Sequence, residues 1–188
     1  MYPDTDYDVI VVGGGPAGST VGALLADAGR KVLVIDREKF PRFRVGESLM
    51  PATYWTLERL GVLDQMKCSS FPNKHSVQFF AKNGEAAAPY YFSRVNQHES
   101  SQTWQVDRRD FDHMLLKNAA AKNADVFEQV RVHDVLFDGD RAIGIRAEFK
   151  NGVKKAITAK VIVDATGQSA IIAKKLKLRR TDPNLKHC

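Results

Sequence analysis

The sequence predicts an α/β fold built on a parallel sheet. Two continuous apolar runs, residues 7–12 and 31–36, are typical of strands buried on both faces. Between them lie a glycine-rich turn and a segment with apolar residues at helical spacing, which predicts a helix that ends near Gly29. A strand, a turn, a helix and a strand in this order make a βαβ unit, whose crossover is expected to be right-handed.

The middle of the chain is predicted to contain helices and a hairpin. Residues 52–66 have helical apolar spacing that is interrupted at Gly61. Residues 75–82 and 88–95 are rich in aromatic residues and flank Asn83-Gly84, so they are expected to be hairpin strands. Residues 108–123 have an apolar face at helical spacing and predict an amphipathic helix.

The last third of the chain is predicted to add an antiparallel β-meander. Its three runs are residues 130–138, 142–150 and 153–159, with turns at Gly139-Asp140 and Asn151-Gly152. Residues 160–176 then predict another buried strand, a glycine turn and a basic helix. The predicted fold is therefore a parallel sheet with an antiparallel meander and a helical and hairpin insertion.

The composition favours a soluble globular protein. Of the 188 residues, 44% are hydrophobic and 27% are charged, and no apolar run is long enough for a membrane span. The acidic, polar N-terminus is unlike a signal peptide, so a cytoplasmic location is expected. The two cysteines, Cys68 and Cys188, suggest neither a disulfide framework nor a metal site, and both are expected to be plain thiols.

The net charge of +6 is concentrated in part in residues 174–180. No nucleic-acid-binding module accompanies this run, so a solvated helix face is the favoured interpretation and no nucleic-acid partner is expected. The positive charge also suits a ligand that carries phosphates.

Gly13, Gly15 and Gly18 form a Gly-x-Gly-x-x-Gly motif, with Pro16 and Ala17 between the last two glycines. The motif stands between a buried strand and a helix, where a dinucleotide-binding fingerprint belongs. The first glycine permits a tight turn, the second lets the backbone approach a pyrophosphate, and the third lets helix and strand pack closely. The partial positive charge of the helix N-terminus would attract the phosphates. A Rossmann-like FAD- or NAD(P)-binding domain is therefore predicted.

Asp36 ends the second predicted strand, and Arg37 follows it. A carboxylate at this position accepts hydrogen bonds from an adenosine ribose and favours FAD or NAD over NADP. The motif alone leaves FAD and NAD open.

Two later segments resemble glutathione-reductase-like flavoproteins, and in particular their aromatic hydroxylase branch. "VIVDATGQS" resembles the late strand and turn of their FAD-binding domain, which implies that Asp164 and Gly167 lie near the cofactor. "WQVDRRDFDHML" resembles the Val-x-Arg-x-x-Phe/Leu-Asp segment, which implies that Arg108 lies near the flavin phosphates with Gln105 beside it. The resemblance also implies a cofactor contact at Val130. An ordinary helix N-terminus at Arg108 and a strand-end cap at Asp164 stay open as alternatives.

"PRFRVGESLMP" is similar to the Gly-Glu-Ser loop of flavin-dependent halogenases, of which tryptophan halogenases are examples. That loop runs along the isoalloxazine. Gly46 would let the backbone approach a flat ring, Glu47 and Ser48 would offer polar contacts, and Arg44 a fixed charge. A loop bounded by prolines that caps the following helix would use several of the same residues.

Lys74 is the catalytic residue that the halogenase resemblance implies. Halogenases carry a lysine in a comparable segment, where its ammonium holds hypohalous acid or forms a haloamine after losing a proton. A surface lysine is the plain alternative, and a structural role is favoured for its neighbour His75.

The resemblance implies an FAD-dependent oxidoreductase that uses reduced FAD and oxygen to oxidise halide for electrophilic substitution of an aromatic substrate. The implied partners are a flavin reductase, halide and a small aromatic substrate, either free or bound to a carrier. Residues 1–188 would form an incomplete FAD-binding domain, with residues 51–103 as an insertion on the flavin and substrate side. Halogenases are longer, and the chain has no Trp-x-Trp-x-Ile-Pro segment, so it is expected to be the N-terminal part of a longer flavoprotein.

Two alternatives remain at this point. An FAD monooxygenase or a geranylgeranyl-reductase-like enzyme would use the same cofactor frame without halide. A non-catalytic FAD-binding protein would bind flavin without turnover that depends on oxygen.

Overall fold

The structure is a computed structural model, and it describes residues 2, 3, 5–180 and 182. The chain forms two compact units: unit 1 is Met1–Phe40 with Leu115–Cys188, and unit 2 is Pro41–Met114. Cys68 is exposed with a free thiol, whereas the expected thiol of Cys188 lies outside the described residues. Within the described part of the chain, no helix is long and apolar enough to cross a membrane.

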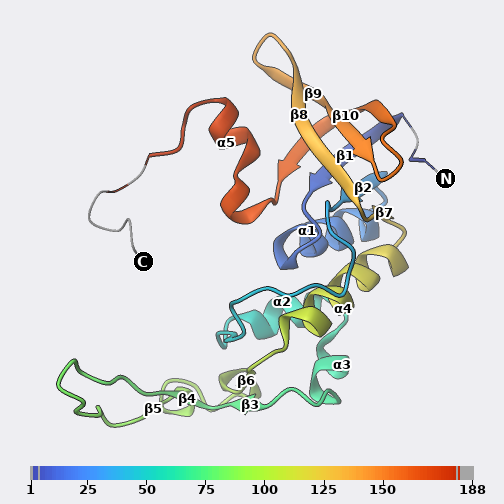
Figure 1. Cartoon of the computed structure of the whole chain (residues 1–188). Helices are drawn as coiled ribbons and strands as arrows, with labels where there is room; N and C mark the ends of the chain where they lie inside the picture. The colour runs from blue at the N-terminus through green and yellow to red at the C-terminus, as the bar shows by residue number, and fades with distance from the viewer. Residues whose placement is uncertain (1, 4, 181, 183–188) are drawn as a thin grey trace. The chain divides into compact units, whose positions relative to one another are not determined.

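Unit 1 is built on a six-stranded sheet with the strand order β7-β2-β1-β10-β9-β8 (Figure 1). Strands β1 (Asp6–Val12), β2 (Val32–Ile35) and β7 (Asp125–Phe127) are parallel, and β2 pairs with both β1 and β7. The two apolar runs of the N-terminal segment are therefore confirmed as parallel strands, and their side chains are almost all buried. β7 is an additional strand that the sequence pattern did not indicate.

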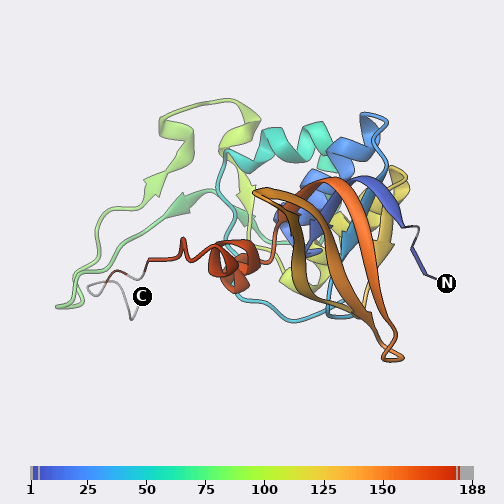
Figure 2. The same cartoon turned by 90° about the horizontal axis from the view of Figure 1, so that it is seen from above.

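The meander consists of β8 (Val130–Asp138), β9 (Arg141–Phe149) and β10 (Lys154–Asp164), and Figure 2 shows these strands in orange as a long curved ribbon. The prediction of separate strands at residues 153–159 and 160–164 was wrong, because β10 is continuous. Lys154–Thr158 pairs antiparallel with β9, and Thr158–Asp164 pairs parallel with β1. No turn residue stands at the expected break, where the Lys160 ammonium reaches the surface and pairs with Asp8 at 2.6 Å.

The main core cluster of unit 1 is formed by side chains of the sheet strands. It contains Ile10, Leu33, Ile35, Val135, Ile145 and Ile157, all at most 1% exposed. Burial of apolar side chains on this scale is the main favourable contribution to folding. The carboxyl ends of β1, β2 and β10 lie side by side in the sheet, and ligands bind at such ends in open α/β sheets.

Helix α1 (Pro16–Asp27) follows β1 and packs against β2. Its second turn approaches the sheet closely at Gly22, where an added Cβ would lie 2.6 Å from Val34 Cγ2. α1 confirms the predicted helix. The basic helix expected near the C-terminus is the short α5 (Ile171–Lys175), which follows a 3₁₀ turn at Gly167–Ser169.

Unit 2 begins with a loop and continues into α2 (Thr53–Leu60) and α3 (Leu63–Lys67). Gly61 ends α2 in the left-handed conformation, which confirms the interruption expected there. α4 (Arg108–Ala121) confirms the predicted amphipathic helix, and the boundary between the units falls within it.

The hairpin of unit 2 is shorter than the sequence predicted. Only β4 (Ser76–Val77) and β5 (Tyr90–Tyr91) pair as strands, with one further bridge between Phe80 and Ala86. A second short pair joins β3 (Asn73–Lys74) to β6 (Thr103–Trp104). Two more 3₁₀ turns, Phe92–Arg94 and Glu99–Ser101, complete the unit.

Candidate functional site

The glycine motif forms a tight turn that only glycine accommodates at two positions. Gly13 has a φ of +111°, and an added Cβ would lie 2.3 Å from the carbonyl oxygen of Ala165. At Gly18 an added Cβ would lie 1.7 Å from the Gly13 carbonyl oxygen. The turn after β1 is therefore packed against the turn after β10, and both of the predicted glycine turns meet in unit 1.

The N-terminus of α1 is suited to phosphate groups. Gly15 is its N-cap without a side-chain cap, Pro16 occupies the first turn, and that turn holds no acidic residue. Its first N–H groups therefore have no carboxylate competitor, and the helix dipole favours an anion there. Ala17 is exposed beside them.

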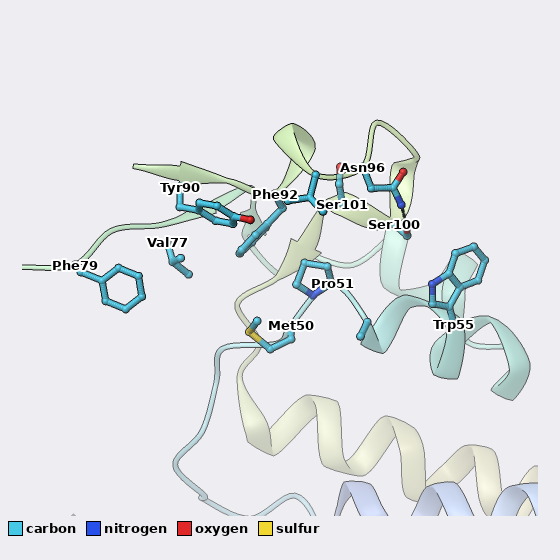
Figure 3. Close-up of a pocket in the computed structure, with 12 residues that line it drawn as sticks. Met50, Pro51, Trp55, Val77, Phe79, Tyr90, Phe92, Asn96, Ser100 and Ser101 are labelled. Carbon is cyan, nitrogen blue, oxygen red and sulfur yellow. Dashed lines mark hydrogen bonds between the residues drawn. The ribbon is translucent and has the colours of Figure 1, made fainter. Parts of the chain in front are cut away.

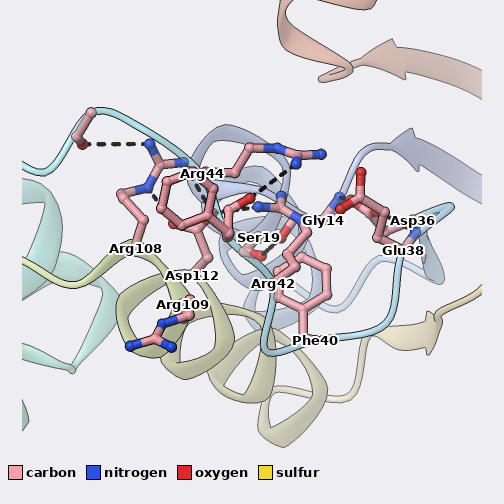
Figure 4. A network of polar contacts seen from close by, with 12 residues as sticks. Gly14, Ser19, Asp36, Glu38, Phe40, Arg42, Arg44, Arg108, Arg109 and Asp112 are labelled. Carbon is pink, nitrogen blue, oxygen red and sulfur yellow. Dashed lines mark hydrogen bonds and ion pairs between the residues drawn. The ribbon is translucent and has the colours of Figure 1, made fainter.

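Asp36 ties the end of β2 to the glycine turn. Its Oδ2 accepts a hydrogen bond from the Gly14 amide at 2.8 Å, and its Oδ1 accepts one from the Glu38 amide at 2.8 Å (Figure 4). The Ser19 hydroxyl donates to the Gly14 carbonyl at 2.9 Å and fixes the same turn from the helix side. A largely buried carboxylate thus stands beside the turn, where the fingerprint requires it.

The remaining unit 1 candidates have different environments. Asp164 accepts from the Thr166 hydroxyl at 2.6 Å and from the Ile172 amide at 2.8 Å, so its carboxylate caps the turn that contains Gly167. Val130 is buried in the core. Arg37 is exposed and pairs with Glu38.

In unit 2 the Gly-Glu-Ser loop is held by Arg108. The Arg108 guanidinium donates from Nη1 to the Val45 carbonyl at 2.9 Å and binds both carboxylate oxygens of Asp112, at 2.7 and 3.0 Å (Figure 4). Arg42 Nη1 donates to the same carboxylate at 2.9 Å. Two segments of the loop are thereby fastened to α4.

Asp112 was missed by the sequence reasoning, although its position was accessible. It lies four residues after Arg108, on the same face of the predicted helix, where an ion pair forms readily. Its side chain is 0% exposed, so its charge requires the two guanidinium partners.

The rest of the loop pairs with the segment before α4. The Val106 amide donates to the Glu47 carbonyl at 2.8 Å, and Ser48 forms a bridge with Gln105. Gly46, with a φ of +112°, turns the chain between the Val45 carbonyl, which Arg108 binds, and these two contacts. Arg44 donates to the Phe43 carbonyl at 3.0 Å.

Lys74 lies against this loop. Its ammonium donates to Ser48 Oγ at 2.6 Å and to the Leu49 carbonyl at 3.1 Å, and it stands 5.4 Å from the centroid of the Phe92 ring. Unit 2 therefore brings together Lys74, Ser48, Gln105, Gly46 and Arg108. His75 is exposed, and its carbonyl accepts from the Phe92 amide.

A cavity of about 580 Å³ opens beside Phe92 (Figure 3). Its lining comes from the end of the loop, the start of α2, the β4–β5 hairpin and the segment that follows: Met50, Pro51, Ala52, Trp55, Val77, Phe79, Tyr90, Phe92, Val95, Asn96, Ser100 and Ser101. The sequence reasoning did not identify this cavity. The available signal was the aromatic residues of the predicted hairpin, such as Phe79 and Tyr90, which are exposed and line the cavity.

The Tyr54 hydroxyl donates a hydrogen bond to Glu99, and the Lys67 ammonium binds the same carboxylate at 3.0 Å. The bond to Glu99 raises the pKa of Tyr54 to about 12, and the bonds from Tyr54 and Lys67 lower the pKa of Glu99. Among the described residues, no cluster of His, Cys, Asp and Glu could hold a metal ion.

The fold and the glycine turns define a dinucleotide-binding domain. A protein-family model described as an FAD binding domain matches residues 6–186. The chain belongs to this family, and its cofactor is FAD. The residues present fit that cofactor, because Gly13 and Gly18 leave no Cβ in the turn and the Asp36 carboxylate lies beside it at the end of β2, where a ribose-binding acid would be needed.

Several similar proteins are halogenases. The 1H-pyrrole-2-carbonyl peptidyl-carrier protein chlorinase of Pseudomonas fluorescens is 36% identical over 197 residues, which covers 96% of this chain and 43% of that protein. The solved myxobacterial chondrochloren halogenase, described as a new variant of FAD-dependent halogenases, is 41% identical with a TM-score of 0.83. The match covers 89% of this chain and 38% of the halogenase. A solved flavoprotein/dehydrogenase from Cytophaga hutchinsonii is 36% identical with a TM-score of 0.84. The match covers 94% of this chain and 43% of that protein. The chain thus spans less than half the length of these relatives.

Proposed function

We propose that this chain is the FAD-binding part of a halogenase-like oxidoreductase. In this proposal, reduced FAD and oxygen serve to oxidise a halide, which then substitutes an electron-rich aromatic substrate. Support comes from the FAD-binding family and from the halogenases among its relatives, one of which acts on a carrier-bound pyrrole. The observation that carries the proposal is that the Lys74 ammonium bonds to the Gly-Glu-Ser loop and contacts the ring of Phe92, which lines an apolar cavity.

The cofactor contacts are proposed to lie in both units. In unit 1 the amides of the α1 N-terminus would hold the pyrophosphate, and Asp36 the ribose. In unit 2 the loop backbone at Gly46 would approach the flavin ring. The proposed set is Gly13, Gly15, Pro16, Ala17, Gly18, Asp36, Arg37, Arg44, Gly46, Glu47, Ser48, Gln105, Arg108, Val130, Asp164 and Gly167. Residues 51–103 are proposed to be the insertion on the flavin and substrate side.

Lys74 is proposed as the catalytic residue. Bound FAD supplies the oxidising chemistry. The Lys74 ammonium has three N–H donors, of which Ser48 and Leu49 use two, and it stands 5.4 Å from the centroid of the Phe92 ring. The group can therefore hold a small polar oxidant by hydrogen bonding and present it to a ring in the cavity. A flavin reductase is the proposed source of reduced FAD.

The direct test is halide-dependent product formation. The purified protein is supplied with FAD, a separate flavin reductase with its nicotinamide, oxygen and indole, with bromide or with no halide, and products are measured by mass spectrometry. The expected product is bromoindole, formed only with bromide. Lys74→Met is expected to reduce it by about a hundredfold or more while FAD still binds.

Lys82→Met is the matched control, because Lys82 is an exposed lysine in the same unit. Its product yield is expected to equal that of the wild type. Equal loss in both variants, or hydroxylated indole in place of bromoindole, would contradict the proposal.

An FAD monooxygenase or reductase is the second candidate. The similarity to the Cytophaga flavoprotein/dehydrogenase, at 36% identity, favours it. Oxygen-dependent turnover that is indifferent to halide and to the Lys74 substitution would support this candidate.

A further inference from the structure

We infer that the cavity of unit 2 binds an uncharged aromatic ring and excludes ionised aromatic molecules, including free amino acids. The inference depends on the proposed function only in naming the occupant as the substrate. The cavity itself is defined by the structure, and its lining residues are all within unit 2.

None of the residues that line the cavity has a charged side chain. Of the twelve residues that the structure places around the cavity, none is Asp, Glu, Lys, Arg or His. Transfer of an ionised carboxylate or ammonium into such a lining, without a partner charge, costs far more free energy than transfer of a neutral ring. An amino acid zwitterion would need two such partners.

Lys74, whose ammonium contacts the Phe92 ring, does not supply that partner. Lys74 reaches the cavity only through its contact with the Phe92 ring, and its ammonium is already bound to Ser48 Oγ and the Leu49 carbonyl. Its third N–H is the donor proposed to hold the oxidant, so a carboxylate bound there would take the place of the oxidant.

The shape and surface favour a flat apolar ligand. Trp55, Phe79, Tyr90 and Phe92 supply aromatic side chains from α2 and the hairpin (Figure 3). The volume is within the range of small-molecule sites. Phe79 and Tyr90 are 70% and 47% exposed, and large aromatic side chains exposed together around a hollow mark a binding site rather than a core.

The polar atoms lie together on one wall. Asn96 Nδ2 and Ser100 Oγ are 3.5 Å apart, and Ser101 lies next to them. Neutral amide and hydroxyl groups can bond a ring N–H or an acyl carbonyl without a net charge. An aromatic acid would therefore enter as its ester, amide or thioester.

Binding is tested without flavin or halide. The purified protein is titrated with methyl indole-3-carboxylate and with indole-3-carboxylate, which is ionised at neutral pH, by calorimetry and Trp55 fluorescence. The ester is expected to bind at least about tenfold more tightly than the acid, because only the acid carries a charge into the cavity. Equal affinity would overturn the inference.

Two matched pairs of variants locate the site. Phe79 lines the cavity and Phe80 does not, yet they are 70% and 68% exposed; Tyr90 lines it and Tyr91 does not, at 47% and 45%. Phe79→Ala and Tyr90→Ala are expected to weaken ester binding several-fold, and Phe80→Ala and Tyr91→Ala to leave it unchanged. Equal effects within each pair would overturn the assignment to this cavity.

A third ligand, the indole-3-carbonyl thioester of pantetheine, distinguishes a carrier-bound aromatic ligand from a free one. Binding tighter than the methyl ester assigns a carrier-borne ring, equal binding assigns a free neutral molecule, and both sustain the inference. If the ester binds as expected but no halide-dependent product forms, the cavity inference stands and the proposed function fails. If acid and ester bind and are halogenated equally, the proposed function stands and the inference fails.

Discussion

Asp112 illustrates how one side chain organises the loop of unit 2. Its buried carboxylate receives hydrogen bonds from Arg42 and Arg108, and Arg108 in turn holds the Val45 carbonyl. A buried ion pair of this kind is weak evidence for net stability, but removal of one partner leaves the other charge uncompensated. The carboxylate therefore matters most for the conformation of the loop.

Asp112→Asn is expected to lower the free energy of unfolding by about 3–5 kcal/mol, because two guanidinium groups lose their charged partner. Urea denaturation measures the change. Asp110→Asn, at an exposed position of the same helix, is the control and is expected to change stability by less than about 0.5 kcal/mol. Similar losses of unfolding free energy in the two variants would contradict the stabilising role of the buried Asp112 network.

Ser48 is expected to act as a positioning residue for Lys74. Ser48→Ala removes the acceptor 2.6 Å from the ammonium, so halide-dependent product should fall about tenfold and its pH dependence should shift. Ser48→Thr retains a hydroxyl and should restore most of the product. A loss that threonine does not rescue, with an unchanged pH profile, would contradict this role.

At the scale of the element, the turn after β1 depends on its lack of side chains. Gly13→Ala would place a Cβ 2.3 Å from the Ala165 carbonyl oxygen at a φ of +111°. FAD binding is expected to be lost, as measured by flavin fluorescence. Gly29→Ala separates the two causes, because Gly29 has a φ of +74° but open space around it. That control should cost about 1–2 kcal/mol of stability and keep FAD binding.

The Tyr54–Glu99 bond predicts how the stability of unit 2 depends on pH. The pKa of Tyr54 is raised from 10.0 to about 12, so its contribution is present below pH 10 and is lost as the pH rises through 12. The pKa of Glu99 is lowered from 4.5, so its contribution is present above pH 4.5 and is lost as the pH falls below it.

Tyr54→Phe is therefore expected to be less stable than the wild type between pH 4.5 and 10, with a difference that shrinks on both sides. Chemical denaturation at a series of pH values measures it. Tyr91→Phe, at an exposed tyrosine, is the control and should show no such plateau. A difference that is constant at every pH would contradict the assignment.

The spacing of apolar residues predicts well those elements whose sequence pattern and end signals are local. β1, α1, β2 and α4 have long apolar patterns and clear end signals, and all are confirmed. β10 was divided wrongly, because one strand changes its partner from β9 to β1 without any local signal. β3 and β6 were not predicted, since two-residue strands are defined by a partner distant in sequence.

At the scale of the whole molecule, the predicted site residues fall into two sets. Unit 1 holds the glycine turns and Asp36, and unit 2 holds the Gly-Glu-Ser loop, Lys74 and the cavity. The motifs could be read from the sequence because glycine and charge at fixed spacing carry a direct physical meaning. The cavity and the sharing of Asp112 by two arginines could not, because they depend on segments joined only by the fold.

The most direct measurement for the whole protein is reduction of its bound flavin. The protein is loaded with FAD under anaerobic conditions, NADH or NADPH is added, and the absorbance of oxidised flavin is followed before and after a flavin reductase is supplied. A halogenase-like protein that receives reduced FAD from a partner predicts that the absorbance persists until the reductase is added. Rapid bleaching by NADH or NADPH alone would contradict that account and identify a protein that reduces its own flavin.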